Sequence, residues 1–323
     1  MKKALISALV IILSLAVTSC ADVGIIGSIE GDAELMRIDD SSRGGELKQY
    51  EKLTESAVKF KDTDAGELYL DIYYPTTRLY ERNPVLVTFH GGGWISGERN
   101  STMMEFQPMT DKLRAQGVCV VTVDYRLANV GAPNRHPSQI EDCLDAIEYL
   151  AANAEAYDID TANLGVMGYS AGAHLAMLSA YGADAFGRSA DIKFCVSFAG
   201  PSKFYDENIA DYSPDTLYFL SELFGSPYED DIESYKNASP YFHMDETDKA
   251  ALLLIQGDSD YLIPPSQARM TYDRAIELGI KAELIEVENC THSFGGYNPT
   301  KFVLPSFHEL CGSAVAFVLD NIR

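Results

Sequence analysis

A five-residue motif near the middle of the chain has the residue types that a nucleophilic serine requires. Gly168-Tyr169-Ser170-Ala171-Gly172 follows a short apolar run and precedes a segment rich in Ala, Leu and Met. A strand, a sharp turn and a helix in that order place the serine in a strained conformation, with its hydroxyl exposed above a sheet. Side chains two positions before and after the serine would collide there, so glycine is expected at both places. Ser170 is therefore the candidate nucleophile; the alternative interpretation is an ordinary tight turn.

A second glycine-rich motif offers backbone hydrogen-bond donors. His90-Gly91-Gly92-Gly93-Trp94 comes directly after an apolar run of strand length that ends at Phe89. Its glycines leave N–H groups unobstructed, as binding of an oxyanion requires. We predict that the donors are the N–H groups of Gly92, Gly93 and Ala171, the residue after the candidate nucleophile. The motif lacks the Gly-Lys-Ser/Thr of a phosphate loop and the spacing of a dinucleotide fingerprint, which disfavours phosphate binding.

An activated serine also needs a base and an acid that orients the base. Two aspartates, Asp258 and Asp260, follow the apolar run at 250–256. Asp258 is next to Gly257, where an aspartate commonly stabilises a turn through its own backbone. Asp260 is two residues further along, where its carboxylate can reach a neighbouring loop. We therefore predict that Asp260 is the orienting acid.

Among the six histidines, His292 has the position expected of the base. It heads a glycine-rich loop directly after the last predicted strand, and the chain order Ser170, Asp260, His292 is that of α/β-hydrolases. Each of the three residues follows a predicted strand, so all three are expected at one edge of the sheet. Of the others, His90 is expected to brace the glycine-rich turn and His174 to have an interior packing role. The remaining three lie elsewhere: His136 precedes Pro137, His243 is in the insertion and His308 is in the last predicted helix.

The elements that must position these residues alternate between strands and helices. Strands are predicted at 57–61, 67–74, 84–89, 118–123, from Leu164, and at 194–199, 250–256 and 282–287. Helices are predicted at 102–116, 137–153, after Ser170, and at 264–279 and 304–322. The first two strands are expected to form an antiparallel hairpin. The pattern predicts an α/β domain with an eight-stranded, mostly parallel sheet flanked by helices. A helical insertion at about 201–249 either shapes a pocket or forms ordinary surface helices.

Together these motifs resemble the hormone-sensitive-lipase and carbohydrate-esterase branch of the α/β-hydrolase superfamily. The resemblance covers roughly residues 55–320 and includes Asp124-Tyr125-Arg126-Leu127-Ala128 and Gly257-Asp258-Ser259-Asp260. It implies an α/β-hydrolase fold and a serine esterase with a Ser-His-Asp triad and an acyl-serine intermediate. Short-chain or carbohydrate-linked acetyl and feruloyl esters are the implied substrates. The chain departs from the family at Thr291-His292-Ser293-Phe294, which stands in place of His-Gly-Phe.

Arg126 comes directly after a predicted buried strand, where an arginine usually pairs with a carboxylate and braces a loop. Glu141 and Asp142 are the candidate partners. The alternative is a surface salt bridge that contributes little to stability.

The composition disfavours several classes of partner. The formal charge of −23 provides no basic stripe for binding nucleic acid or an anionic membrane surface. The sequence contains no Cys-x-x-Cys, His-Glu-x-x-His or acidic calcium-loop pattern. We therefore expect no catalytic metal and no cofactor.

The first 50 residues have the features of a targeting segment and a tether. Lys2 and Lys3 precede an apolar run that ends before Cys20, an arrangement that resembles the bacterial lipobox. We predict a signal peptide at 1–19, lipidation of Cys20, a tether at 20–50 and the hydrolase domain at 51–323. This implies a lipid-anchored lipoprotein of the bacterial cell envelope; the alternative is plain secretion. Of the other five cysteines, Cys290 and Cys311 are the pair that could form a disulfide.

Two other functions compete with ester hydrolysis. The first is an amidase or peptidase of the same fold, although peptidases of the prolyl-oligopeptidase kind usually carry an extra N-terminal domain, for which the tether leaves no room. The second is a catalytically inactive surface lipoprotein that binds a ligand on a hydrolase scaffold. Retention of the three triad residues and of the glycine-rich motif argues against the second function.

Overall fold

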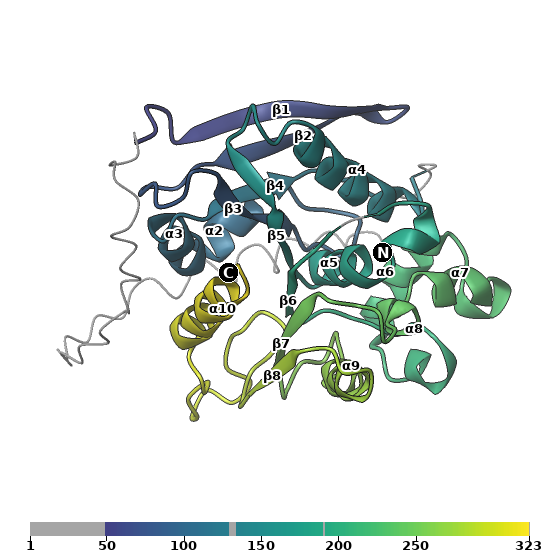
Figure 1. Ribbon diagram of the computed structural model, residues 1–323. Coiled ribbons are helices and arrows are strands. Elements are labelled where there is room, and N and C mark those ends of the chain that lie inside the picture. Colours follow the sequence, from purple (N-terminus) through teal and green to yellow (C-terminus); the bar gives the residue numbers. More distant parts are fainter. Residues whose placement is uncertain (1–48, 129–133, 190, 323) are drawn as a thin grey trace, which may run out of the picture. The chain divides into compact units, whose positions relative to one another are not determined.

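An eight-stranded sheet runs through the part of the chain that the computed structural model describes, residues 49–128, 134–189 and 191–322. The strand order is β1-β2-β4-β3-β5-β6-β7-β8 (Figure 1). The strands are β1 (Thr54–Thr63), β2 (Gly66–Tyr73), β3 (Asn83–Phe89), β4 (Cys119–Val123), β5 (Ile159–Tyr169), β6 (Phe194–Phe198), β7 (Ala251–Gly257) and β8 (Ala282–Val287). The β1–β2 and β2–β4 pairs are antiparallel, and all later pairs are parallel. The predicted eight-stranded, mostly parallel sheet is therefore confirmed.

Helices cover both faces of the sheet (Figure 1). They are α2 (Ser101–Glu105), α3 (Gln107–Ala115), α4 (Ser138–Ala152), α5 (Ala171–Tyr181), α6 (Pro214–Phe224), α7 (Ile232–Asn237), α8 (Pro240–His243), α9 (Ser266–Glu277) and α10 (Phe307–Asn321). Alternate side chains of each strand enter two different cores. In β3, Val87 packs in the core beneath α4, α5 and α9, whereas Leu86 packs in the core beneath α3 and α10. Burial on both faces explains why the central strands are almost continuously apolar.

The predicted helix at 102–116 is wrong in one respect: it is two helices, α2 and α3, interrupted at Phe106. Pro108 lies in the first turn of α3, where the missing N–H of proline costs nothing. Continuing α2 through this point would place the proline in a helix interior, where its ring clashes with the preceding turn. The buried ring of Phe106 packs instead against Tyr169 and Phe198.

The segment at 201–249 is a helical insertion, as predicted. It contains α6, α7, α8 and the short 3-10 turns Asp206–Ile209 and Tyr228–Asp230. Helix α6 begins at a well-formed N-terminus, because Ser213 accepts a hydrogen bond from the Thr216 N–H and Pro214 occupies the first helical position. The insertion follows β6, so it leaves the sheet at the same edge as the serine turn.

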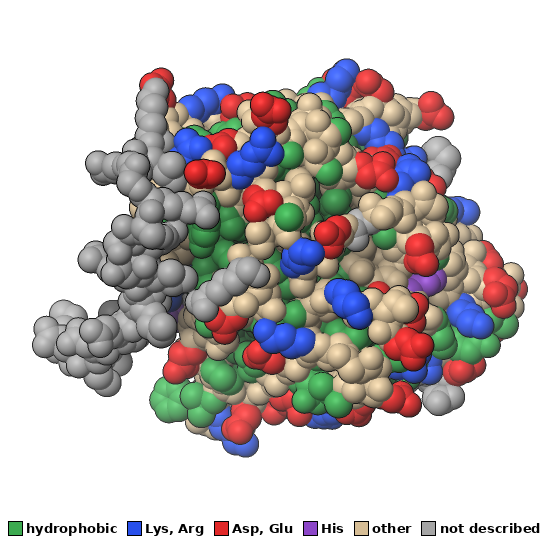
Figure 2. All heavy atoms as spheres, viewed as in Figure 1, with side chains coloured by type: hydrophobic (Ala, Val, Ile, Leu, Met, Phe, Trp, Pro, Cys, Tyr) green, Lys and Arg blue, Asp and Glu red, His purple; other side chains and the backbone are tan. Residues whose placement is uncertain are grey.

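Charged side chains are dispersed over the face of the molecule seen in Figure 2, where acidic and basic groups alternate. The five cysteines of the described residues are free thiols and are buried, so the possible Cys290–Cys311 disulfide is not formed. Among the described residues, no helix is both long enough and apolar enough to cross a membrane. The predicted signal peptide, Cys20 and nearly all of the tether lie outside the described residues.

Candidate active site

Ser170 occupies the turn between β5 and α5 in a backbone conformation that is unusual for a residue with a side chain. Its φ is 54° and its ψ is −119°, and its N–H donates a 2.8 Å hydrogen bond to the carbonyl of Phe198. The two glycines of the motif are needed for close backbone contacts. A Cβ at Gly168 would lie 2.1 Å from the carbonyl carbon of Gly172, and one at Gly172 would lie 2.0 Å from the carbonyl oxygen of Phe89. The steric explanation of the motif therefore holds.

The structure brings Ser170, His292 and Asp260 together in one hydrogen-bonded chain. The Ser170 Oγ is 2.9 Å from Nε2 of His292, and the Nδ1 of His292 is 2.8 Å from Oδ2 of Asp260. A neutral imidazole with its proton on Nδ1 satisfies both contacts, because it donates to the carboxylate and accepts from the hydroxyl. His292 and Asp260 are 4% and 5% exposed, so these polar contacts are shielded from water. The arrangement can accept the serine proton and stabilise the resulting imidazolium.

The carboxylate of Asp260 is held on both of its oxygens. Oδ1 accepts hydrogen bonds from the N–H groups of Leu262 and Ile263, both at 2.9 Å. Oδ2 accepts from Nε2 of Gln256, also at 2.9 Å, in addition to the bond from His292. Gln256 is buried at the end of β7. Sequence reasoning did not identify this glutamine, because a glutamine at a strand end carries no distinctive local signal.

Asp258 has a different role from the one expected. We expected it to stabilise a turn through its own backbone, but its Oδ1 accepts a 3.2 Å hydrogen bond from the N–H of Cys290, two residues before His292. Ser259 also donates to this oxygen at 2.8 Å. Asp258 therefore connects the loop that carries the acid to the loop that carries the base.

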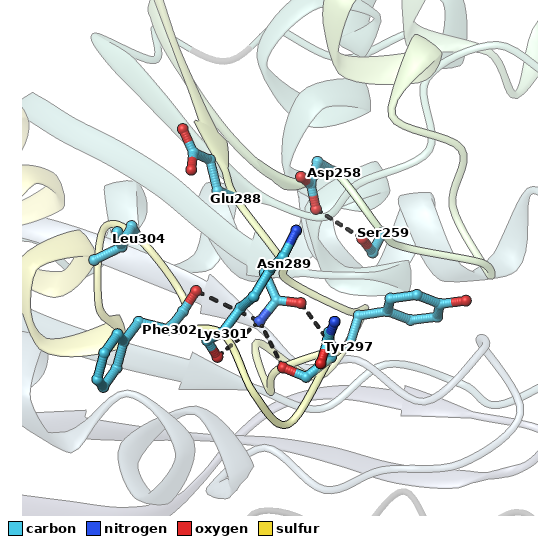
Figure 3. Close-up of a pocket in the computed structure, with 9 residues that line it drawn as sticks. Asp258, Ser259, Glu288, Asn289, Tyr297, Lys301, Phe302 and Leu304 are labelled. Atoms are coloured by element: carbon cyan, nitrogen blue, oxygen red, sulfur yellow. Dashed lines mark hydrogen bonds between the residues drawn. The ribbon is translucent and has the colours of Figure 1, made fainter.

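The loop around His292 is fixed by polar contacts. The hydroxyl of Tyr169 donates a 3.0 Å hydrogen bond to the carbonyl of His292. Burial raises the pKa of Tyr169 well above its usual value, so the phenol stays protonated as this donor. Further along the loop, the side-chain amide of Asn289 donates to the carbonyls of Asn298 and Lys301 at 3.1 and 3.0 Å (Figure 3). These contacts predefine the shape of the loop.

An open hollow of about 820 Å³ lies beside this loop, at the ends of β7 and β8 (Figure 3). It is lined by Asp258, Ser259, Glu288, Asn289, Tyr297, Asn298, Lys301, Phe302 and Leu304. Its lining combines carboxylate, amide and ammonium groups with two aromatic side chains. Ser170 and His292 are not part of the lining, so the hollow adjoins the hydrogen-bonded chain but does not contain it.

The glycine-rich turn follows β3, which pairs with β5, and therefore lies beside Ser170 in the sheet. Gly92 and Gly93 have φ values of 113° and 60°, which favour glycine. A Cβ at Gly92 would lie 2.1 Å from the carbonyl oxygen of Ser96. Within the described residues, no protein acceptor pairs with the N–H groups of Gly92, Gly93 or Ala171. These three N–H groups are therefore available to a ligand.

His90 braces the glycine-rich turn, as expected. Its Nδ1 is 2.7 Å from the carbonyl oxygen of Gly91, and its ring stacks on Tyr125 with 4.2 Å between centroids. The Tyr125 hydroxyl donates a 2.8 Å hydrogen bond to the His90 carbonyl. Tyr125, in the Asp124-Tyr125-Arg126 segment, therefore holds the glycine-rich turn in place through its contacts with His90.

His174 has the interior packing role that we expected, together with a hydrogen-bonding role that we did not foresee. Its Nδ1 accepts a 3.2 Å hydrogen bond from the indole N–H of Trp94, and its Nε2 donates to the carbonyl of Ala238 at 2.7 Å. Burial lowers the pKa of His174 to about 4, so the ring stays neutral and can make both contacts at neutral pH. The ring joins the glycine-rich turn to the helical insertion.

Arg126 pairs with both predicted carboxylates. Its Nε and Nη2 each lie 2.8 Å from a different oxygen of Asp142, which is a bidentate salt bridge. The Oε2 of Glu141 lies 3.4 Å from Nη2. Lys61 contacts Asp142 at 2.5 Å. Asp142 is fully buried, so the pair is not the surface salt bridge that was the alternative.

Comparison with known proteins gives a family match and many relatives. Residues 70–274 match the BD-FAE family model, which is more than half of the chain. A probable isoprenylcysteine alpha-carbonyl methylesterase of Arabidopsis thaliana is 28% identical over 238 residues, which are 69% of this chain and 54% of the relative. Esterase LipC of Mycobacterium tuberculosis is 26% identical over 242 residues, 71% of this chain and 57% of the relative. The chain thus spans a little over half the length of these curated relatives.

Solved structures show the same fold. A truncated carbohydrate esterase from gut microbiota has a TM-score of 0.69 and 19% identity, covering 84% of this chain and 96% of that one. An esterase of Thermogutta terrifontis has a TM-score of 0.66 and 22% identity, covering 83% and 94%. At these identities the likeness establishes the α/β-hydrolase fold.

Proposed function

Because the chain belongs to the BD-FAE family of α/β-hydrolases, we propose that it is a serine hydrolase that cleaves carboxylic esters. One observation carries the proposal: the Ser170 Oγ, the His292 imidazole and the Asp260 carboxylate form a continuous hydrogen-bonded chain of 2.9 and 2.8 Å. The strained turn at Ser170 and the unpaired N–H groups beside it supply the other requirements for attack on a carbonyl.

In the proposed reaction, the Ser170 Oγ attacks the ester carbonyl carbon while Nε2 of His292 takes the hydroxyl proton. Asp260 keeps the other imidazole proton on Nδ1 and stabilises the imidazolium. The N–H groups of Gly92, Gly93 and Ala171 hold the negative oxygen of the tetrahedral intermediate. The intermediate collapses as the carbon–oxygen bond to the alcohol breaks and His292 returns the proton to the leaving oxygen. Water then releases the acyl group from Ser170 by the same steps.

We propose that the substrates are short-chain or carbohydrate-linked esters, with acetyl and feruloyl groups as the candidate acyl groups. The hollow beside the base loop supports the carbohydrate-linked class. The side chains of Tyr297 and Phe302 are 71% and 85% exposed there, next to hydrogen-bonding groups. Exposed aromatic rings beside polar groups suit the apolar faces and hydroxyls of sugars.

The proposal is tested by hydrolysis of p-nitrophenyl acetate by the wild type and by Ser170→Ala. We expect the variant to lose about 10⁴- to 10⁶-fold in kcat, as is typical when a nucleophile is removed. Ser266→Ala is a matched control, because Ser266 begins α9 and its hydroxyl makes no hydrogen bond to any other described residue. Ser170→Ala activity within tenfold of the wild type would rule out the assignment. A p-nitroanilide tested in parallel distinguishes esterase from amidase activity.

We further propose that residues 1–19 are a signal peptide and that Cys20 is lipidated, which would anchor the protein in the bacterial cell envelope through a tether at 20–50. The support is the order of positive, apolar and small residues before Cys20. Incorporation of labelled fatty acid by the wild type and its loss in Cys20→Ala would test this proposal. Equal labelling of both proteins would contradict it.

A further inference from the structure

Helix α6 of the insertion contacts two of the segments that build the site, the loop that carries Asp260 and the glycine-rich turn. The Thr216 hydroxyl donates a 2.8 Å hydrogen bond to the carbonyl of Leu262, two residues beyond Asp260. One turn further along α6, Phe219 packs on Gly93: a Cβ placed on this glycine would lie 2.9 Å from two atoms of the phenyl ring. Residues three apart lie on one face of a helix. The face of α6 with Thr216 and Phe219 therefore reaches from the loop that carries Asp260 to the glycine-rich turn.

The position of α6 is fixed rather than variable. Its N-terminus is capped by Ser213. Leu220 and Leu223, which follow Thr216 and Phe219 by four residues and so lie on the same side of the helix, are completely or almost completely buried. The carbonyl of Leu223 accepts a 2.9 Å hydrogen bond from the N–H of His136, and the ring of Phe224 stacks on Tyr235 at 3.8 Å. The face that carries Phe219 is therefore a preformed wall.

The order of the strands indicates which part of an ester meets this wall. The glycine-rich turn follows β3 on one side of β5, whereas the loops with Asp260 and His292 follow β7 and β8 on the other side. The leaving alcohol must lie close to His292, because this residue returns the proton to it. The carbonyl oxygen points to the N–H groups of Gly92 and Gly93. The acyl group is bonded to the same carbon on the side away from His292, so it extends past Gly93 and meets the ring of Phe219, which packs on that glycine.

We propose that Phe219 limits the length of the acyl group and makes the site selective for acetyl over longer or aromatic acyl groups. This inference rests on the proposed ester hydrolysis and narrows its candidate substrates to acetyl esters. The ring is in contact distance of Gly93, one of the proposed oxyanion donors, so an acyl chain extending past the first carbons would have to displace it. The preformed position of α6 makes such displacement unfavourable.

The test compares kcat/KM for p-nitrophenyl acetate and p-nitrophenyl hexanoate. Phe219→Ala is expected to raise the hexanoate-to-acetate ratio at least tenfold, since each methylene accommodated in a pocket is worth about tenfold or more. Phe219→Leu, a milder change that keeps an apolar contact with Gly93, is expected to raise the ratio by a smaller factor. Leu217→Ala is the control, because two residues correspond to about 200° around the helix axis, which points Leu217 away from Phe219.

The hexanoate-to-acetate ratio of kcat/KM distinguishes a failure of the role of Phe219 from a failure of the proposed ester hydrolysis. If the wild type hydrolyses neither ester, the proposed function fails. If it hydrolyses acetate and the ratio changes less than twofold in both folded Phe219 variants, the role of Phe219 is refuted while ester hydrolysis stands. An equal rise in Leu217→Ala would also refute it, because the effect would then come from loosening α6.

Discussion

Replacing Asp260 with asparagine preserves the shape of the side chain and changes the hydrogen bonding of one atom. Oδ1 of Asp260 accepts two backbone N–H groups, so the amide oxygen of the variant should take that position. The amide nitrogen would then face Nε2 of Gln256 and Nδ1 of His292, which both act as donors in the wild type. His292 can avoid the conflict by moving its proton to Nε2. In that tautomer it cannot accept the proton of Ser170.

The size of the effect follows from this tautomer change. A base held in the wrong tautomer lowers kcat by about 10⁴, which corresponds to a barrier higher by about 5 kcal/mol. The amide of Gln256 also loses one of its two main acceptors in a buried position and keeps the carbonyl of Ile263. The loss should lower the free energy of unfolding by about 1–3 kcal/mol. We therefore expect Asp260→Asn to be folded, somewhat less stable and nearly inactive.

The assay is kcat for p-nitrophenyl acetate, with thermal unfolding measured on the same samples. Asp258→Asn is the matched control, because Asp258 lies in the same turn and contacts Cys290 rather than His292. We expect the control to lose less than tenfold in kcat. A folded Asp260→Asn variant within tenfold of the wild type, or an equal loss in Asp258→Asn, would refute the reasoning.

Three further predictions concern stability. Gly172→Ala places a Cβ 2.0 Å from the carbonyl oxygen of Phe89, so we expect a loss of about 3 kcal/mol, seen as a fall in Tm of about 6 °C or more; an unchanged Tm would contradict the close contact. Burial raises the pKa of Glu105 to about 7, so the folded state keeps a proton that the unfolded state has released, and stability falls as the pH rises from about 4.5 to 7. Glu105→Gln should therefore gain up to about 3 kcal/mol at pH 8 and nothing at pH 4 in urea titrations; an equal gain at both values would show that burial of the charge is not the cause. Arg126→Met removes one of the two cations that pair with the buried Asp142 carboxylate and leaves only Lys61. The free energy of unfolding should therefore fall by about 3 kcal/mol in the same titrations. A fall below about 1 kcal/mol would show that the pair contributes no more than an exposed surface salt bridge.

Local rules account for the part of the site that the sequence could predict. The turn at Ser170 requires glycines at fixed offsets, and residues at the carboxyl ends of parallel strands must meet at one edge of the sheet. These two constraints were enough to place Ser170, Asp260 and His292 together without coordinates. The alternation of strands and helices likewise predicted all eight strands. The signal is strongest in the central strands β3, β4, β6 and β7, which are buried on both faces and therefore continuously apolar.

The features that could not be predicted depend on partners that are distant in the sequence. Gln256 supports Asp260, and Phe219 packs on Gly93, but neither side chain belongs to a recognisable local pattern. The hydrogen bond between Trp94 and His174 joins residues 80 positions apart. The break at Phe106 is hard to predict for another reason: helical periodicity continues through it, and only Pro108, two residues later, marks the start of a new helix.

The most direct test of the central claim is covalent labelling with a fluorophosphonate, which reacts with an activated serine. We predict one adduct per molecule, mapped to Ser170 by peptide mass analysis, no adduct in Ser170→Ala and much slower labelling of Asp260→Asn. An unlabelled wild type, or an adduct mapped to a different residue, would contradict the claim that Ser170, His292 and Asp260 act as one catalytic unit.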